Sequence, residues 1–151
     1  MHSYRFLALI LVLACGPSAW AQANQPLTDT EAAEKRINAE VERLMNKDPS
    51  TAGMSEAIEW ERQEWDSLMN AAYKDLLTHL DPQGKDALRD SQRAWIAYRD
   101  LEGQAQYSLF GNLQGTMFIP MSVNARARVV KHRAIELMSL LRIAKIGVGI
   151  E

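Results

Sequence analysis

The amino-acid sequence predicts an all-α domain, and three observations support this prediction. Apolar residues recur at intervals of three and four positions over long segments, which is the period of an amphipathic helix. Groups of loop-forming residues separate these segments, most clearly at 48–53 and 81–84. The composition, 47% hydrophobic and 24% charged over 151 residues, is that of one ordinary globular domain. We therefore expect a compact up-and-down arrangement of four helices joined by short loops.

The first 21 residues have the pattern of a secretory signal. The apolar run from Phe6 to Ala14 is shorter than the roughly 20 residues that span a bilayer. Gly16-Pro17 then interrupts any helix before Ala19-Trp20-Ala21, a small-x-small cleavage site. We predict cleavage after Ala21, export to the periplasm, and a single domain over 22–151. Because Val12-Leu13-Ala14-Cys15 is similar to a bacterial lipobox, a lipoprotein anchored through Cys15 is the alternative.

The charge of the mature chain limits its partners. Without residues 1–21 the chain keeps 16 basic and 19 acidic residues, a net charge of −3. A nucleic-acid binder normally carries a basic face, so nucleic acid is not an expected partner. The mild acidity is compatible with a basic protein partner. The single cysteine lies within or beside the signal, so we expect no disulfide framework.

The first two helices are expected at 29–47 and about 55–80. Thr28 and Glu31 have the spacing of a capping box, which places the first helix start near Asp29. Ser55 is a suitable cap for the second helix. The second helix carries an early acidic outer surface made of four residues: Glu59, Glu61, Glu64 and Asp66.

The third helix, about 82–106, is expected to fold back on the second and form a central hairpin. Asp81 is a good N-cap, and Pro82 is tolerated at the first helical position. Residues 107–119 keep neither a helical nor a strand period, so they predict one long apolar loop. A last helix is expected over about 120–142, followed by a frayed tail at 143–151.

The two helices of this hairpin carry motifs that resemble a known family. The second helix contains L-x-N-x-x-Y, with Asn70 and Tyr73, and the third contains Q-R-x-W-x-x-Y-R-D. Together these resemble the LprI N-terminal domain-like family, small exported bacterial proteins named for a lysozyme inhibitor. The resemblance covers about 60–141. Its residues in the third helix are Gln92, Arg93, Trp95, Tyr98, Arg99 and Asp100.

The chain departs from the pattern of that family at two positions. Family members commonly carry a cysteine near the position of Gly103 and another near 124–126, and this chain has neither. A bridge closing such a loop would contribute about 3 kcal/mol. The 107–119 loop is therefore expected to be held by its own apolar side chains, or to be looser than in relatives.

The polar members of these motifs have a structural and a functional interpretation. Gln92, Trp95 and Arg99 share one helical face, which the hairpin would turn toward Asn70. In the structural interpretation, Asn70, Gln92 and Arg99 form a hydrogen-bonded seam, and Trp95 and Tyr98 anchor the core. In the functional one, the same residues line a ligand or partner cleft.

The apolar loop also has two interpretations. Its large side chains either close one end of the bundle or form an exposed lip that contacts a partner. The candidate contact residues are Tyr107, Phe110, Met117 and Phe118.

No residue pattern predicts catalysis, a cofactor or a metal. His79 and His132 lack ligand spacing, and no serine has a nucleophile-elbow setting. The resemblance instead implies a binding protein that inhibits a lysozyme-like peptidoglycan hydrolase by covering its cleft. The alternative is an envelope structural, adaptor or immunity-type protein without a lysozyme target.

Overall fold

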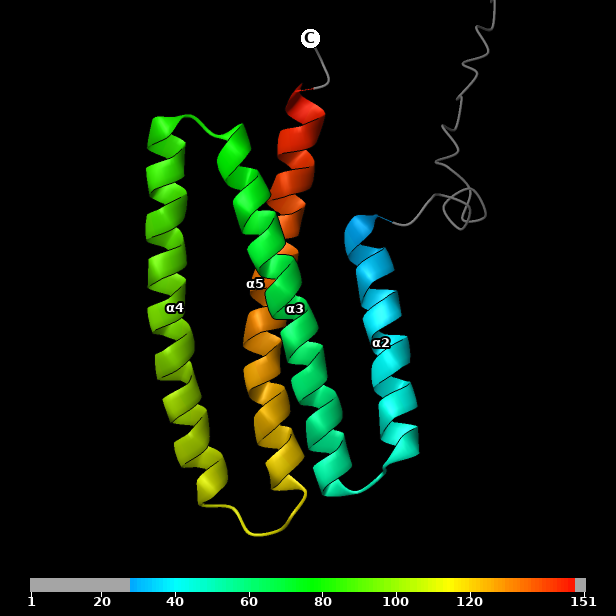
Figure 1. Ribbon diagram of the computed structural model, residues 1–151. Helices are drawn as coiled ribbons and strands as arrows, with labels where there is room; N and C mark the ends of the chain where they lie inside the picture. The colour runs from blue at the N-terminus through cyan, green and yellow to red at the C-terminus, as the bar shows by residue number, and fades with distance from the viewer. Residues whose placement is uncertain (1–27, 149–151) are drawn as a thin grey trace, which may run out of the picture.

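Four helices make up the computed structural model, which describes residues 28–148. They are α2 (Asp29–Lys47), α3 (Thr51–His79), α4 (Pro82–Gly111) and α5 (Phe118–Val148), and this part of the chain contains no strand. Consecutive helices run in opposite directions (Figure 1). The all-α, four-helix prediction is therefore confirmed. None of these helices is long and apolar enough to cross a membrane. The predicted signal and Cys15 lie outside the described residues.

Side-chain caps explain where the first three helices begin. The capping box of α2 is present: Thr28 Oγ1 accepts from the Glu31 N–H, and the Glu31 carboxylate accepts from the Thr28 N–H at 2.8 Å. Asp81 caps α4 by accepting from the Gly84 N–H at 2.7 Å. The predicted start of α3 at Ser55 is wrong. Ser50 is its cap, accepting from the Gly53 N–H at 3.1 Å.

The predicted loop at 107–119 is shorter than expected. Helix α4 continues through Gly111, so the connection to α5 is only 112–117. Within it Gly115 has φ of 117°, a conformation that disfavours any side chain. Helix α5 begins at Phe118 with Pro120 in its first turn, where a missing N–H costs nothing, and it extends beyond 142 to Val148. The predicted frayed tail is therefore helical over 143–148.

The hydrophobic core lies between α3 and α5, with α2 covering one side. Helix α3 packs far more extensively on α5 than on α4, and α4 packs on α5. The sequence-based view of the 55–80 and 82–106 hairpin as the packing centre is therefore corrected. In Figure 1, α4 stands at the edge of the α3–α5 pair. The buried cluster consists of Ile37, Trp65, Met69, Ala72, Leu76, Val130, Ala134 and Leu137.

The pairing follows from the side chains that each helix offers. Ala72 and Ala134 are small and buried, so the backbones of α3 and α5 can approach closely. Helix α4 contains no buried residue. Only Leu88 and Trp95 of α4 pack against the core cluster, as partly buried neighbours. Helix α4 is thus attached to a core formed by α2, α3 and α5 rather than being part of its centre.

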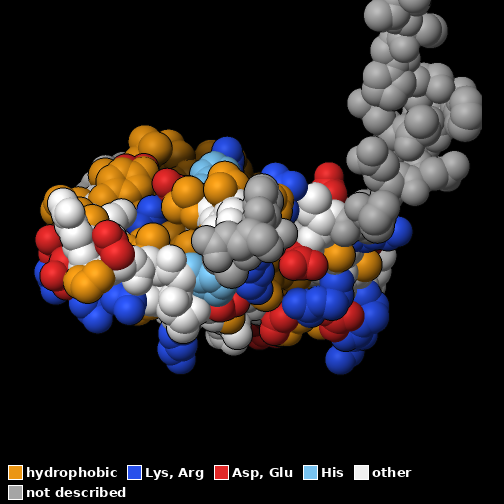
Figure 2. Space-filling model, turned by 90° about the horizontal axis from the view of Figure 1, so that it is seen from above, with side chains coloured by type: hydrophobic (Ala, Val, Ile, Leu, Met, Phe, Trp, Pro, Cys, Tyr) orange, Lys and Arg blue, Asp and Glu red, His pale blue; other side chains and the backbone are white. Residues whose placement is uncertain are grey.

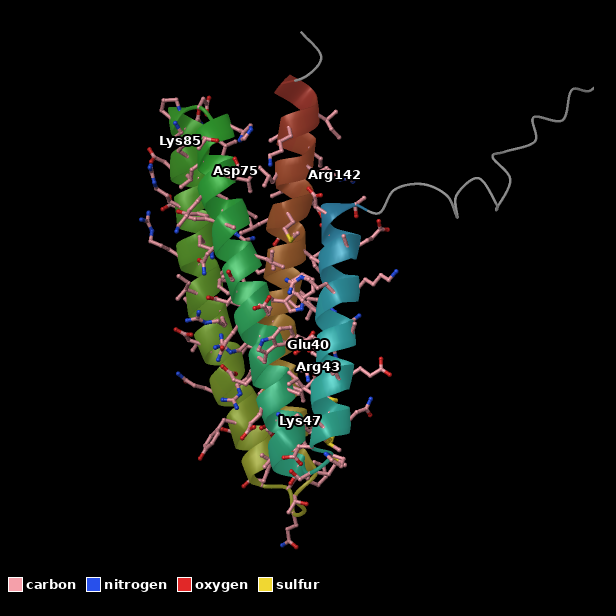
Figure 3. The ribbon with its side chains drawn as sticks, turned by 45° about the vertical axis from the view of Figure 1, so that its right-hand side comes forward. Glu40, Arg43, Lys47, Asp75, Lys85 and Arg142 are labelled. Carbon is pink, nitrogen blue, oxygen red and sulfur yellow. The ribbon has the colours of Figure 1, made fainter. Side chains whose placement is uncertain are left out.

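An ion pair between the ends of α3 and α5 makes stability depend on pH. Lys145 Nζ lies 2.9 Å from Asp75 Oδ2, and this hydrogen bond lowers the pKa of the Asp75 carboxyl (Figure 3 labels Asp75). Because the folded pKa is lowered, the stabilisation is complete above the unfolded pKa of about 3.9. It is lost as the pH falls through the folded pKa.

We therefore predict that Asp75→Asn lowers the melting temperature at neutral pH, and that this difference disappears as the pH falls and the Asp75 carboxyl becomes protonated in the folded protein. Thermal melts of the two proteins across this range check the prediction, with Lys145→Gln as a second variant that removes the same pair. A difference that stays constant down to the lowest pH would show that the pair is not its source.

Candidate functional site

The face of α4 that meets α5 is organised by Arg133, a residue that sequence reasoning missed. Arg133 is only 7% exposed. Its guanidinium donates to Gln92 Oε1 at 3.1 Å and to Ser91 Oγ at 3.0 Å, both on α4, and to Glu136 at 2.7 Å. Gln92 Nε2 also lies 3.8 Å from Met69 Sδ of α3. Arg133 is thus the main polar link between α4 and the core.

The expected seam of Asn70, Gln92 and Arg99 does not form. The Asn70 amide is exposed and donates to Asp66 of its own helix, to the carbonyl at 2.8 Å and the carboxylate at 3.0 Å. Arg99 bonds to Asp100 at 2.7 Å and lies over the Trp95 ring, 5.4 Å from its centroid. The reason is that α4 packs mainly on α5 rather than on α3, so Gln92 reaches Met69 of α3 but Asn70 faces away from α4.

The remaining motif residues lie at the edge of the core or outside it. Tyr73 and Trp95 are partly buried and pack against the core cluster. Tyr98 is 53% exposed, so its expected role as a core anchor is wrong. Arg93 forms an exposed pair with Asp90 one turn earlier. Trp65, which is fully buried, takes the anchoring position instead.

The four candidate contact residues lie together at the end of the bundle where α4 connects to α5. We call this group, Tyr107, Phe110, Met117 and Phe118, the lip. Tyr107 is 78% exposed and Met117 is 54% exposed, while Phe110 and Phe118 are half-buried. Three of the four, together with Leu113 and Ile119, line an apolar depression of about 430 Å³. Two members of the lip are thus half-buried in the fold, and the other two are mainly exposed to solvent.

A charge-free segment surrounds the lip. No residue from Gly103 to Ala125 is charged, in a chain of which 24% is charged. This run could have marked the surface from sequence alone. Exposed apolar side chains also continue around the lip, at Leu109, Leu113, Ile119 and Met121. A contiguous apolar surface of this kind is typical of a contact with another molecule.

The acidic surface that the sequence predicts on α3 is largely neutralised. Glu59 pairs with Arg62 at 2.7 Å and Glu64 with Arg36 at 3.0 Å. The Arg62 guanidinium lowers the pKa of the Glu59 carboxyl. Glu40 and Arg43 form a similar pair on α2, at 2.6 Å (Figure 3). Attraction of a basic partner by unpaired acids on this surface is therefore weaker than net charge alone would indicate.

The opposite end of the bundle carries both apolar and charged side chains. Figure 2 looks along the helices from that end, and hydrophobic side chains gather at its upper left, whereas charged side chains dominate its lower right.

Within residues 28–147, no group of three or more His, Cys, Asp and Glu side chains is placed to hold a metal ion. His79 Nδ1 lies 2.9 Å from the Asp75 carbonyl oxygen.

Removal of the Arg133 side-chain charge should loosen α4 selectively. Arg133→Met keeps most of the aliphatic volume but removes the bonds to Ser91 and Gln92. We expect unfolding free energy to fall by about 1–3 kcal/mol and amide hydrogen exchange to accelerate in α4 more than in α3. Glu136→Gln is the control, because the Glu136 side chain is 58% exposed and its loss should cost little. Equal acceleration in α3 and α4 would contradict this role for Arg133.

The fold and these surfaces define a class of protein: a four-helix bundle with a packed three-helix core and a peripheral helix that leads into an exposed apolar lip. The family model described as "Lysozyme inhibitor LprI" matches residues 42–137. The chain belongs to this family. The match begins within α2, earlier than the sequence resemblance indicated, and ends within α5.

Of two further comparisons with known proteins, one found a similar structure and the other found no match. No curated protein matches it significantly. A crystal structure of an uncharacterised protein from Burkholderia thailandensis is similar, with a TM-score of 0.67 and 26% sequence identity. The similarity covers 72% of this chain and 55% of that one, so the chain spans about half the length of that relative.

Proposed function

We propose that this chain is an exported binding protein that inhibits a lysozyme-like peptidoglycan hydrolase by covering its substrate cleft. The observation that carries the proposal is the family match over 42–137, which includes all of α3 and α4 and most of α5. Inhibition of this kind requires no catalytic residue. It requires a rigid scaffold and a surface that fits a cleft.

The lip is the surface that best suits this role. Tyr107 lies near the end of α4 and Met117 in the short loop that follows it, both mainly exposed, whereas Phe110 and Phe118 are half-buried. Aromatic side chains on a rigid base are frequent anchors of protein interfaces. The half-buried members reduce the ordering cost of binding, because they are already fixed before the partner arrives.

The absence of charge around the lip also suits a glycosidase cleft. Such clefts hold two carboxyl groups beside the scissile bond. An acidic segment would be repelled there, and a desolvated charge without a partner would be costly. The segment from Gly103 to Ala125 carries neither penalty.

Export is part of this proposal because peptidoglycan lies outside the cytoplasmic membrane. The sequence offers two alternative N-termini for the mature chain. One follows cleavage at Ala19-Trp20-Ala21, and the other follows cleavage at the lipobox-like Val12-Leu13-Ala14-Cys15. Mass spectrometry of the exported protein separates them: cleavage after Ala21 starts the chain at Gln22, whereas the lipoprotein form starts at a lipidated Cys15.

The proposal is tested by measuring lysis of bacterial cell walls by lysozymes of several structural classes, with purified residues 22–151 added. We expect stoichiometric inhibition of at least one class. Lysis that continues unchanged for every class at a large molar excess of the protein would contradict the proposal. Heat-denatured protein serves as the control for nonspecific adsorption.

A second function, that of an envelope adaptor or immunity-type protein, is favoured by the outer face of α4. Tyr98 and Leu101, three positions apart on this face, are 53% and 64% exposed on a helix that contains no buried residue. Pull-down from periplasmic extract separates the two functions. Recovery of a hydrolase supports inhibition, whereas recovery of an assembly component supports the adaptor.

A further inference from the structure

A groove between α3, α4 and α5, adjacent to the lip, has the properties of a second binding site. Its volume is about 700 Å³, within the usual range for sites that bind small ligands. Val123, Val129 and Val130 of α5 contribute apolar surface. Arg62, Arg99 and Arg126, one from each of the three helices, supply positive charge.

The three arginines differ in how their charge is balanced. Arg62 is paired with Glu59, and Arg99 is paired with Asp100, each at 2.7 Å and each within its own helix. Both of these acids also line the groove. Arg126 is exposed and forms no ion pair with any residue in the described part of the chain, although its positive charge helps to lower the pKa of the Glu59 carboxyl. The groove therefore holds one positive charge in excess, at Arg126.

A hydrogen-bond acceptor in the groove wall also lacks a partner. The Gln106 side chain lines the groove, and its Nε2 donates to Glu102 at 3.0 Å. This bond fixes the orientation of the amide. Gln106 Oε1 is buried and, among the described residues, receives no hydrogen bond. Buried acceptors are normally satisfied. This oxygen has almost no accessible surface, so a donor from a ligand reaches it only after a small movement of the Gln106 side chain.

We propose that this groove binds the carboxyl-terminal end of a short peptide with small aliphatic side chains. The terminal carboxylate would pair with Arg126, whose guanidinium matches a carboxylate through two parallel hydrogen bonds. A peptide N–H would donate to Gln106 Oε1, and methyl groups would contact the three valines. Both a protein C-terminus and a cell-wall stem peptide offer this chemistry. The site is adjacent to the lip proposed as the hydrolase contact and shares Tyr107 with it.

Gly103 provides a direct way to block the groove. It lies within α4, lines the groove, and a Cβ atom added there would meet nothing within 4 Å. The Cβ of a larger side chain is therefore accommodated without a clash, and the rest of that side chain would take up space in the groove. Replacing a glycine inside a helix also favours the helix. Gly111 is the matched control, because a Cβ there is equally free and Gly111 does not line this groove.

The test uses ¹⁵N-labelled protein of residues 22–151 and three probes: acetyl-tetraalanine with a free carboxylate, the same peptide with a C-terminal amide, and the free acid ending in D-Ala-D-Ala. We expect amide shifts at Gly103 and Val123 with a free acid, and binding at least tenfold weaker with the amide probe. The better of the two acids identifies the source as a protein terminus or a wall peptide.

Variants locate the binding. Arg126→Gln should weaken binding of the free acid at least tenfold, Gly103→Trp should abolish it, and Gly111→Trp should leave it unchanged. Circular dichroism confirms that each variant is folded, and Gly103→Leu replaces Gly103→Trp if the latter is not. Equal binding of acid and amide, binding that survives the Gly103 variants, or no shifts at millimolar peptide would each overturn the proposal. None of these measurements involves a hydrolase. A negative result would therefore contradict peptide binding in the groove without contradicting the proposed inhibition, which the cell-wall lysis assay tests.

Discussion

Replacement of Trp65 by alanine should lower the free energy of unfolding by about 3–5 kcal/mol, the usual cost of truncating a buried aromatic residue. Trp65 is 0% exposed and lies in the cluster shared by α2, α3 and α5. Its Nε1 donates to Glu61 at 3.2 Å, and Lys131 Nζ lies 5.3 Å from the ring centroid. The free energy of unfolding of a small domain is only about 5–15 kcal/mol. The variant should therefore be close to unfolding.

Urea denaturation of Trp65→Ala and Trp95→Ala provides the comparison. Trp95 is the same residue type but sits on α4 and is only partly buried, so its truncation should cost clearly less. The sequence alone favoured Trp95 as the core anchor. A loss for Trp95→Ala as large as that for Trp65→Ala would show that α4 belongs to the centre of the core after all.

The double variant Tyr107→Ser, Met117→Ser should reduce inhibition of the target hydrolase by a factor of about 30 or more. Truncation of one interface anchor typically costs about 2 kcal/mol, which corresponds to about a 30-fold change in affinity. Both side chains are mainly exposed, at 78% and 54%, so the melting temperature should change little. Inhibition constants from the cell-wall lysis assay, with thermal melts in parallel, check both parts.

The matched control is Tyr98→Ser, Leu101→Ser on the outer face of α4. These side chains are 53% and 64% exposed, so a similar apolar area is removed away from the lip. Inhibition should be retained. If the control loses inhibition while the lip variant keeps it, the outer face of α4 is the contact surface and the lip is not.

Local sequence signals were sufficient to predict the helices but not their packing. The Thr28–Glu31 box and the Asp81-Pro82 start act within one helical turn, and both are present as predicted. Ser50 was missed because Pro49 and Gly53 made 48–53 resemble a loop. Helix α4 extends past residue 106, the end predicted from the sequence. No residue between Tyr107 and Gly111 terminates the helix before the turn at Gly115.

The pairing of α3 with α5 could not be predicted because it depends on residues far apart in sequence. Ala72 and Ala134 permit a close approach, and Arg133 selects Gln92 as its partner, a separation of 41 residues. Proximity in sequence favoured α3 with α4 instead. The candidate lip was predictable because its residues are close in sequence, whereas the groove requires three helices to meet.

The positions at which this chain lacks the cysteines of its family lie at the groove between α3, α4 and α5. The family resemblance places cysteines near Gly103 and near 124–126, and Gly103, Val123 and Arg126 all line the groove. A bridge between such positions would tie α4 to the start of α5. Without it, α4 is held through Arg133 and a few apolar contacts, and the groove between the helices is left open.

Competition with a substrate-like oligosaccharide tests the central claim most directly. A chitooligosaccharide that fills the cleft of an inhibited lysozyme should displace this protein, and the apparent inhibition constant should rise in proportion to the concentration of the sugar. Simultaneous binding of the sugar and the protein, with an inhibition constant independent of sugar, would contradict occlusion of the cleft.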